Sequence, residues 1–339
     1  MANPLRIVVI GGGTGLSALL LGLKRYADQD AAGNLPRVDI TAVVTVTDDG
    51  GSSGRLRREF DVLPPGDIRN CMVALSRDEA LLSQLFQYRF ESGRGLKGHS
   101  FGNLFLMALT RVMGDFPEAV RASSEVLKIA GRIYPSTNAN VSLEAVLDDG
   151  SRVVGETRIS RTRRRIERIR LVPPRVRPLA ATLAAIADAD LITLGPGSLY
   201  TSVVPNLLVN GIPAAIRRSR ALKAYFVNLM WQPGETMNFR ASDHLKAIHQ
   251  HARGKLIDYA VVNIRPIRPA LKKRYARTLA MPVENDVEEL FQMGVQVVAG
   301  NLLHQGEHVR HDPEQIAAVA VRLAREGRQK RTALAAQAK

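Results

Sequence analysis

The sequence predicts an α/β fold: a Rossmann-like, doubly wound, mostly parallel sheet with a small inserted β subdomain. Three observations predict it. Short apolar runs rich in β-branched residues alternate with helical segments, as in parallel sheets covered by helices on both faces. A glycine-rich turn directly follows the first of these runs. Residues 140–174 instead alternate apolar and polar positions, which is typical of antiparallel strands.

Six short apolar runs are the predicted strands of the main sheet: Arg6–Ile10, Val38–Val46, Asp190–Leu194, Ala224–Asn228, Ile257–Asn263 and Val295–Ala299. Segments with helical spacing separate them, beginning with the stretch from the glycine turn to Tyr26. The others are Ile68–Ser76, Glu79–Phe90, Phe101–Met113, Pro117–Ile129, Leu179–Ala187, Ser242–His251 and Pro313–Glu326. We therefore expect residues 1–139 and 175–325 to form one nucleotide-binding core.

The inserted subdomain is predicted at residues 140–174. Val141–Leu147 and Arg152–Ile159 flank an Asp-Asp-Gly turn, as in a hairpin, and Ile166–Val172 adds a third strand. Beyond the core, residues 326–339 form a basic tail, and we expect the last dozen residues to fray.

The charge of the chain is concentrated in segments. The 339 residues hold 47 Lys and Arg against 32 Asp and Glu, a net charge of +15. Residues 158–177, 265–277 and 322–339 together carry +19, so the rest of the chain sums to −4. Nucleic-acid binding favours basic residues interleaved with aromatic ones, and residues 158–177 contain no aromatic residue. This composition disfavours a nucleic-acid partner, although a binder of nucleic acid or anionic surfaces stays an alternative.

The composition and the apolar runs also indicate the class of protein and its cellular location. An apolar share of 45% and a charged share of 23% exclude a disordered chain, and the single Cys71 excludes an intramolecular disulfide. The apolar run Leu5–Ile10 is short for a signal peptide, and Leu16–Leu23 is too short to span a bilayer. We therefore expect a cytoplasmic protein with no membrane span.

The first candidate site is the turn after the first strand. It comprises Gly11, Gly12, Gly13, Thr14, Gly15, Leu16 and Ser17, which open a helix. Glycines expose amide hydrogens at a helix N-terminus, where a phosphate binds favourably. The spacing departs from GxGxxG and the turn lacks the lysine of a P-loop, so a tight turn without a ligand stays open.

Two acidic segments follow. The second predicted strand is followed directly by Thr47, Asp48, Asp49 and Gly50. At this position an acid contacts a ribose hydroxyl in dinucleotide folds, and adjacent acids also suit Mg²⁺. Asp67, Arg69 and Asn70 lie at a helix start, in a pattern that suits metal and phosphate binding. An Asp-Gly turn and an N-cap at Asp67 are the simpler interpretations. Asp48 and Asp67 are the candidate metal ligands.

Two later loops also place glycines and polar residues directly after predicted strands. They contribute Gly195, Gly197, Ser198 and Thr201 after one strand, and Asn228, Gln232, Glu235 and Thr236 after the next. Backbone amides and hydroxyls in the first loop suit an anion, and the second loop suits a sugar or a base. His99 and Asn103 lie at another helix start, where His99 either caps the helix or contacts a phosphate. We assign no catalytic residue.

Read in order, these motifs resemble the CofD/YvcK family, and most closely its YvcK branch, the bacterial gluconeogenesis factors. The resemblance runs from Gly11–Ser17 through the motifs above to Ser242-Asp243-His244, which adds His244 to the expected site, and it covers nearly the whole chain. It implies a Rossmann-like core with a smaller inserted subdomain. Where the family has Met-Thr-Gln-Pro-Gly-Glu-Thr, this chain carries Trp231 in place of the threonine.

The resemblance implies two alternative functions. YvcK-like proteins bind UDP-sugars such as UDP-N-acetylglucosamine without established turnover, and support cell shape and growth on gluconeogenic carbon sources. CofD-like proteins transfer a phospholactyl group from a guanosine diphosphate donor to the deazaflavin Fo, with Mg²⁺ on acids corresponding to Asp48 or Asp49 and Asp67. We expect the first function, in a homo-oligomer with protein partners in cell-wall synthesis.

Overall fold

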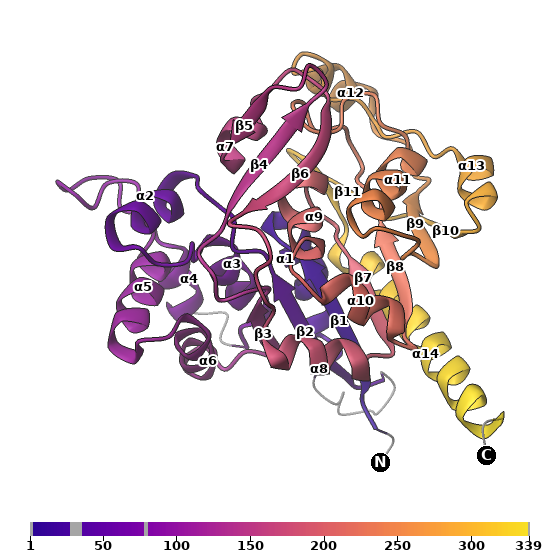
Figure 1. Cartoon of the computed structure of the whole chain (residues 1–339), viewed down its shortest axis with the longest axis horizontal. Coiled ribbons are helices and arrows are strands. Elements are labelled where there is room, and N and C mark those ends of the chain that lie inside the picture. Colours follow the sequence, from indigo (N-terminus) through magenta and orange to yellow (C-terminus); the bar gives the residue numbers. More distant parts are fainter. Residues whose placement is uncertain (1–2, 28–35, 78–80, 338–339) are drawn as a thin grey trace.

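The main sheet of the protein has seven strands, all parallel (Figure 1). The computed structural model describes residues 3–27, 36–77 and 81–337, with the backbone alone for 334–337. The strand order is β10-β9-β8-β7-β1-β2-β3. Their bounds are β1 Leu5–Gly11, β2 Val38–Val44, β3 Arg132–Pro135, β7 Leu191–Leu194, β8 Leu222–Phe226, β9 Tyr259–Asn263 and β10 Gln296–Gly300. The predicted α/β class is confirmed.

The sheet is doubly wound. The chain adds β2 and β3 on one side of β1 and then β7 to β10 on the other, so its direction reverses between β1 and β7. Helices α1, α3 and α14 pack together over one face, and α8 to α11 lie in front of the sheet in Figure 1. Their bounds are α1 Gly13–Lys24, α3 Gly66–Leu75, α14 Pro313–Gln337, α8 Ala180–Asp188, α9 Val204–Leu207, α10 Ile212–Arg218 and α11 Ala241–His251. Ligands of such sheets bind at the carboxyl ends of the strands where the direction reverses.

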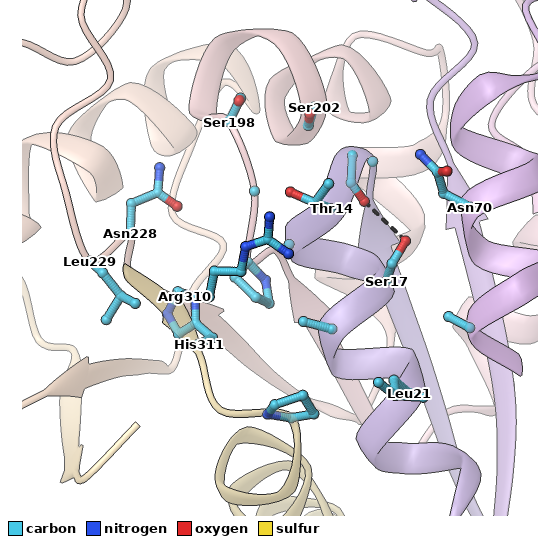
Figure 2. Close-up of a pocket in the computed structure, with 18 of the residues that line it drawn as sticks. Thr14, Ser17, Leu21, Asn70, Ser198, Ser202, Asn228, Leu229, Arg310 and His311 are labelled. Atoms are coloured by element: carbon cyan, nitrogen blue, oxygen red, sulfur yellow. Dashed lines mark hydrogen bonds between the residues drawn. The ribbon is translucent and has the colours of Figure 1, made fainter. Parts of the chain in front are cut away.

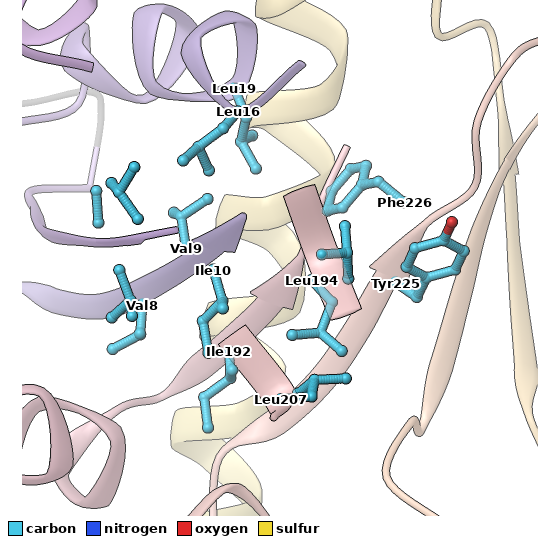
Figure 3. Close-up of a cluster of buried hydrophobic side chains, with 14 of the residues drawn as sticks. Val8, Val9, Ile10, Leu16, Leu19, Ile192, Leu194, Leu207, Tyr225 and Phe226 are labelled. Atoms are coloured by element: carbon cyan, nitrogen blue, oxygen red, sulfur yellow. The ribbon is translucent and has the colours of Figure 1, made fainter. Parts of the chain in front are cut away.

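The buried apolar side chains form one large core that extends from the main sheet into the inserted subdomain, and Figure 3 shows the part of it around β1, β7 and helix α1. Every residue of β1 except Arg6 is buried, as expected for a parallel strand covered on both faces. In α1, Leu16, Leu19, Leu20 and Leu23 follow the i, i+3, i+4, i+7 pattern and are fully buried. Each such leucine contributes about 1.5–3 kcal/mol on burial. This packing fixes the orientation of α1 and so the position of its N-terminus.

The inserted subdomain is a three-stranded antiparallel sheet in the order β5-β4-β6, with β4 Ser142–Leu147, β5 Arg152–Val154 and β6 Ile166–Val172. It rises from the end of the molecule opposite the start of β1 (Figure 1). The prediction of one strand over Arg152–Ile159 is wrong in its second half. Gly155 has φ +102, a conformation that favours glycine, and helix α7 occupies Glu156–Ile159.

Several elements were not predicted. Helix α2, Gly51–Phe60, begins in a Gly-Ser-Ser-Gly stretch that reads as a loop, and β3 has only four residues. A hairpin of β11, Leu303–Gln305, and β12, Val309–His311, precedes α14. Helices α12 Pro269–Ala276 and α13 Val287–Gln292 were also not predicted. By contrast, α5 Phe101–Met113 and α6 Phe116–Val126 match predicted helices, and the π-helix η1 Leu199–Val203 follows the loop after β7. Helix α4 spans Leu81–Gln87. The predicted helix Glu79–Phe90 is observed as α4, and its residues 79–80 lie outside the described residues.

Helix α14 continues to Gln337, so the basic tail expected at residues 326–339 belongs to this helix as far as the structure describes it. Its Arg328 and Arg331 form ion pairs with Asp190, which is fully buried directly before β7 (Arg331 at 2.6 Å). The basic residues of this helix therefore help to hold it against the sheet.

Among the described residues, no single helix is both long and apolar enough to cross a membrane. One pair of short helices, Leu199–Leu207 and Ile212–Arg218, reaches that length and composition only when joined across a 75° bend.

Candidate functional site

A cleft of about 1190 Å³ opens where the sheet changes direction. It is bordered by the N-terminus of α1, the loops after β7 and β8, helices α3 and α4, and the β11–β12 hairpin. Figure 2 shows Thr14, Ser198, Ser202, Asn228 and Arg310 around this space. The glycine turn and the later strand-end loops predicted from the sequence thus meet at one place.

The N-terminus of α1 offers backbone amides to the cleft. Gly12 is its N-cap residue and supplies no side-chain hydrogen bond to the first turn. Gly12, Gly13, Thr14, Gly15 and Ser17 all line the cleft. A Cβ at Gly15 would stand 2.5 Å from the carbonyl oxygen of Pro196, so only glycine permits the turn to pack against the loop after β7. The arrangement suits an anion held by helix amides.

Polar groups from neighbouring segments also line the cleft. The loop after β7 contributes the backbone of Gly197 and the hydroxyl of Ser198, and η1 contributes Ser202. Gln232 donates through Nε2 to the hydroxyl of Ser198, and Asn228 donates through Nδ2 to Gln232 Oε1 at 3.2 Å. These three side chains form one hydrogen-bonded chain along the cleft, with hydroxyl and amide groups that can contact a sugar or a phosphate.

Four cationic side chains line the cleft: Lys24 in α1, Arg69 in α3, Arg89 in the loop after α4 and Arg310 in β12. Burial, followed by the charge of Arg89, lowers the pKa of Arg69, which donates to Asn70 Oδ1 at 2.7 Å. In Figure 2 the guanidinium of Arg310 extends toward Thr14 at the start of α1. An anion at that helix terminus would meet this guanidinium, which recognises phosphate oxygens in a bidentate way.

Carboxylates gather behind the glycine turn. Asp67 accepts a hydrogen bond from the backbone N–H of Gly13, and burial followed by the charge of Asp48 raises its pKa to about 7. Burial also raises the pKa of Asp48, which accepts from the N–H of Gly50 at 2.8 Å. The pKa of Glu156 in α7 is raised to about 9, first by burial and then by the charges of Asp48 and Asp67. The inserted subdomain thus brings a carboxylate that the sequence did not predict.

The described residues include no group of three or more His, Cys, Asp or Glu side chains arranged to hold a metal. Mg²⁺ commonly takes one or two protein carboxylates and completes its coordination with phosphate oxygens and water. Burial is the largest cause of the raised pKa of each of Asp48 and Asp67, and the charge of a neighbouring carboxylate raises each pKa further. A bound cation would offset that charge, so Asp48 and Asp67 are the carboxylates that would hold Mg²⁺ here, although neither lines the cleft itself.

The structure brings some of the predicted residues to the cleft and places others around it. Arg69, Asn70, Gly197, Ser198, Asn228 and Gln232 line the cleft together with Gly12–Gly15 and Ser17. The predicted residues that are not among the lining residues are Gly11, Leu16, Thr47, Asp48, Asp49, Gly50, Asp67, His99, Asn103, Gly195, Thr201, Glu235, Thr236 and His244.

Most of these outlying residues have structural partners. His99 is buried and shares a hydrogen bond with Ser52 through Nδ1 at 3.0 Å. The buried Glu235 accepts from the hydroxyl of Thr201 and the N–H of Tyr200, both at 3.1 Å. His244 is buried in α11, and this burial lowers its pKa to about 4. These side chains hold the surrounding loops in place.

The sequence interpretation missed the β11–β12 hairpin altogether. Arg310 and His311 line the cleft, and the Nε2–H of His311 donates to the carbonyl oxygen of Val227 at 3.2 Å, which ties the hairpin to the end of β8. Each strand of this hairpin has three residues, too few for a periodic pattern. The only signal was the cluster of His304, His308, Arg310 and His311.

Comparison with known proteins agrees with this architecture. The CofD family profile, described as 2-phospho-L-lactate transferase CofD, matches residues 7–303. A gluconeogenesis factor of Bacillus subtilis is 46% identical over 96% of this chain and all of its own length. Another from Halalkalibacterium halodurans is 47% identical over 92% of this chain and 94% of its own length.

A solved crystal structure of a protein from Bacillus halodurans superimposes with a TM-score of 0.89 at 45% identity, covering 94% of this chain and all of that one. The fold, the glycine turn after β1 and the similarity over most of the chain all point to the same family. The chain belongs to the CofD family, within its group of bacterial gluconeogenesis factors.

Proposed function

We propose that this protein is a cytoplasmic regulator that binds a UDP-sugar of the UDP-N-acetylglucosamine type in the cleft. The observation that carries the proposal is the α1 N-terminus facing Ser198 and Arg310 where the sheet changes direction. Helix amides and a guanidinium on two sides of one space suit a diphosphate. The volume of about 1190 Å³ is ample for a nucleotide ligand.

The neighbouring groups suit the remainder of such a ligand. The Asn228–Gln232–Ser198 chain offers donors and acceptors for sugar hydroxyls. Trp231 also lines the cleft, and its indole N–H donates to the carbonyl oxygen of Phe239 at 2.9 Å, which fixes the ring beside the loop after β8. An aromatic ring held in this way offers a surface on which a base can stack. In this proposal the ligand state regulates cell-wall precursor use and cell shape.

A second candidate function is transfer of a phospholactyl group from a guanosine diphosphate donor to Fo. The Asp48–Asp67 pair favours it, because these carboxylates would hold Mg²⁺ against the diphosphate of a donor. The Mg²⁺ would offset the charge of the phosphates. The residues of the chain would bind and orient the donor, with the α1 amides contacting its diphosphate and Arg310 its outer oxygens.

Calorimetric titration separates the two functions. The purified chain is titrated with UDP-N-acetylglucosamine and with GDP, each with and without Mg²⁺, and is then incubated with a phospholactyl guanosine diphosphate donor and Fo. The regulator predicts saturable UDP-sugar binding and an unchanged ligand after incubation. Absence of UDP-sugar binding together with Mg²⁺-dependent transfer to Fo would establish the enzyme instead.

A further inference from the structure

A groove that the nucleotide proposal does not use runs between the inserted sheet and α11. Its main part has a volume of about 710 Å³ and is lined by residues of β6 and α11, by Val146 and Asp148 at the end of β4, and by Tyr200 and Phe239. A smaller hollow of about 380 Å³, lined by Arg163–Arg165 and the Gly234–Phe239 loop, shares Arg165, Phe239 and Asp243 with it. We call the two together the insert groove.

Unpaired arginines gather at the insert groove. Arg163, Arg165, Arg168 and Arg170 are exposed, and within the described part of the chain none has a carboxylate at ion-pair distance. The adjacent Arg164 does have partners, Asp148 at 3.7 Å and Asp149 at 3.1 Å. The most basic segment of the sequence therefore leaves four cationic side chains without anionic partners along one groove.

Backbone groups of β6 are already engaged along this groove. The N–H of Ile169 donates to His251 Nε2 at 2.9 Å, and Gln250 donates to the carbonyl oxygen of Glu167 at 3.4 Å. An incoming chain therefore cannot extend the inserted sheet at these positions. It would be recognised by side chains, and guanidinium groups match carboxylates with paired hydrogen bonds.

The groove favours a protein over a nucleic acid. The ring of Tyr200 is buried, and it makes edge contacts with Phe239 (6.2 Å, 75°) and His251 (5.8 Å, 70°). Its faces are therefore not an open platform for base stacking, on which single-stranded nucleic acids depend. The carboxylates of Asp148, Glu167 and Asp243 line the main part of the groove, Glu235 lines the smaller hollow, and these charges would repel a continuous phosphate backbone. A polypeptide can place its own cationic or neutral groups at those four positions.

We propose that the insert groove binds an acidic segment of a partner protein, whose carboxylates pair with Arg163, Arg165, Arg168 and Arg170. The groove adjoins the nucleotide cleft through η1, because Tyr200 lines the groove while Ser202 of the same short helix lines the cleft. Glu235 accepts hydrogen bonds from η1 and from Ser160 of the insert at 3.4 Å, so it joins the two regions. The proposal does not depend on which nucleotide the cleft binds.

The test uses the full chain and a fluorescein-labelled peptide in which glutamate alternates with serine. Fluorescence anisotropy at physiological ionic strength compares wild type with the triple variant Arg163→Glu, Arg165→Glu and Arg168→Glu. The matched control reverses three exposed basic residues in and next to α12: Arg268→Glu, Lys273→Glu and Arg277→Glu. A labelled oligodeoxynucleotide of equal net charge is measured in parallel. Thermal melting verifies that each variant is folded.

We expect the groove variant to bind the peptide at least about tenfold more weakly than wild type, with the control variant within about twofold. Wild type should also prefer the peptide to the oligodeoxynucleotide. Equal losses in the groove and control variants would show attraction by overall charge and overturn the proposal. Absence of peptide binding, or tighter binding of the oligodeoxynucleotide, would overturn it as well. None of these outcomes depends on whether the cleft binds a UDP-sugar.

Discussion

Asp49 of the core accepts two hydrogen bonds from Thr157 of the inserted subdomain, one from its backbone N–H at 2.8 Å and one from its hydroxyl at 2.7 Å. The neighbouring Asp48 instead accepts from Gly50 and is coupled electrostatically to Asp67. The two adjacent aspartates therefore have different roles, although they look equivalent in the sequence. Asp49 anchors the insert, whereas Asp48 stands behind the glycine turn.

Replacing Asp49 should loosen the insert. We expect Asp49→Ala to lower the free energy of unfolding by about 1.5–3 kcal/mol, because it removes two hydrogen bonds to a charged acceptor. Urea denaturation measures the loss, and Glu307→Ala is the control, because Glu307 is an exposed carboxylate in the β11–β12 turn with no hydrogen bond or ion pair within the described residues. A double-mutant cycle with Thr157→Val should show coupling between the two sites. Additive effects would contradict the anchoring role.

Removing the guanidinium of Arg310 should weaken ligand binding and leave the fold intact. Arg310 is exposed at the cleft and forms no ion pair within the described residues. Loss of a charge-assisted contact to a diphosphate costs about 1.5–3 kcal/mol, or roughly ten- to a hundredfold in Kd. Calorimetry with UDP-N-acetylglucosamine tests Arg310→Ala against Arg268→Ala, an exposed arginine at the start of α12. Equal affinities of the two variants would remove Arg310 from the site.

The hairpin that carries Arg310 should be destabilised by acid. Burial lowers the pKa of His311 to about 4, below the ordinary value of 6.5. The unfolded chain therefore takes up a proton between about pH 6.5 and 4 that the folded chain resists, so stability falls as the pH decreases through this window. His311→Gln keeps an N–H donor for Val227 but does not titrate.

Urea denaturation of wild type and His311→Gln at pH 7.5 and pH 4.5 checks this expectation. The difference in unfolding free energy between the two proteins should move in favour of the variant at the lower pH, and the contributions of all other groups cancel in that comparison. A difference that is the same at both pH values would show that His311 is not held neutral.

The ion pairs of Asp190 should make α14 important for stability. Asp190 is fully buried, so removing its cationic partners leaves an uncompensated charge, which costs about 3–5 kcal/mol. We expect this loss for Arg328→Met with Arg331→Met. The control is Arg322→Met with Arg325→Met on an exposed face of the same helix. Chemical denaturation compares the two double variants. Equal denaturation midpoints would show that the ion pairs of Asp190 do not hold α14 against the sheet.

The sequence predicted most of the main sheet because its buried parallel strands are continuous apolar runs. Leu5–Gly11 and Tyr259–Asn263 are clear examples. It missed β3 because a strand of four residues that ends at Pro135 carries little pattern. It missed α2 because Gly51–Gly54 favours a loop in isolation, whereas tertiary packing buries Ser52, Ser53 and Gly54 in a helix.

The candidate site was predictable where glycines and polar groups directly follow strands, as at Gly12–Gly15 and Gly197-Ser198. Arg310 and Glu156 were not, because they reach this region from a three-residue strand and from a four-residue helix after Gly155. His99 and His244 have residue types suited to binding, yet both are buried beside the site. The positions of motifs after predicted strands indicate which loops meet. The direction of each side chain depends on tertiary packing, which the sequence pattern does not show.

A crystal structure of the protein with UDP-N-acetylglucosamine tests the central claim most directly. The account predicts the diphosphate within hydrogen-bond distance of the Gly13–Gly15 amides and Ser198, with the Arg310 guanidinium on its outer oxygens. A nucleotide found in the insert groove, or a cleft whose glycine turn makes no contact with phosphate, would contradict it.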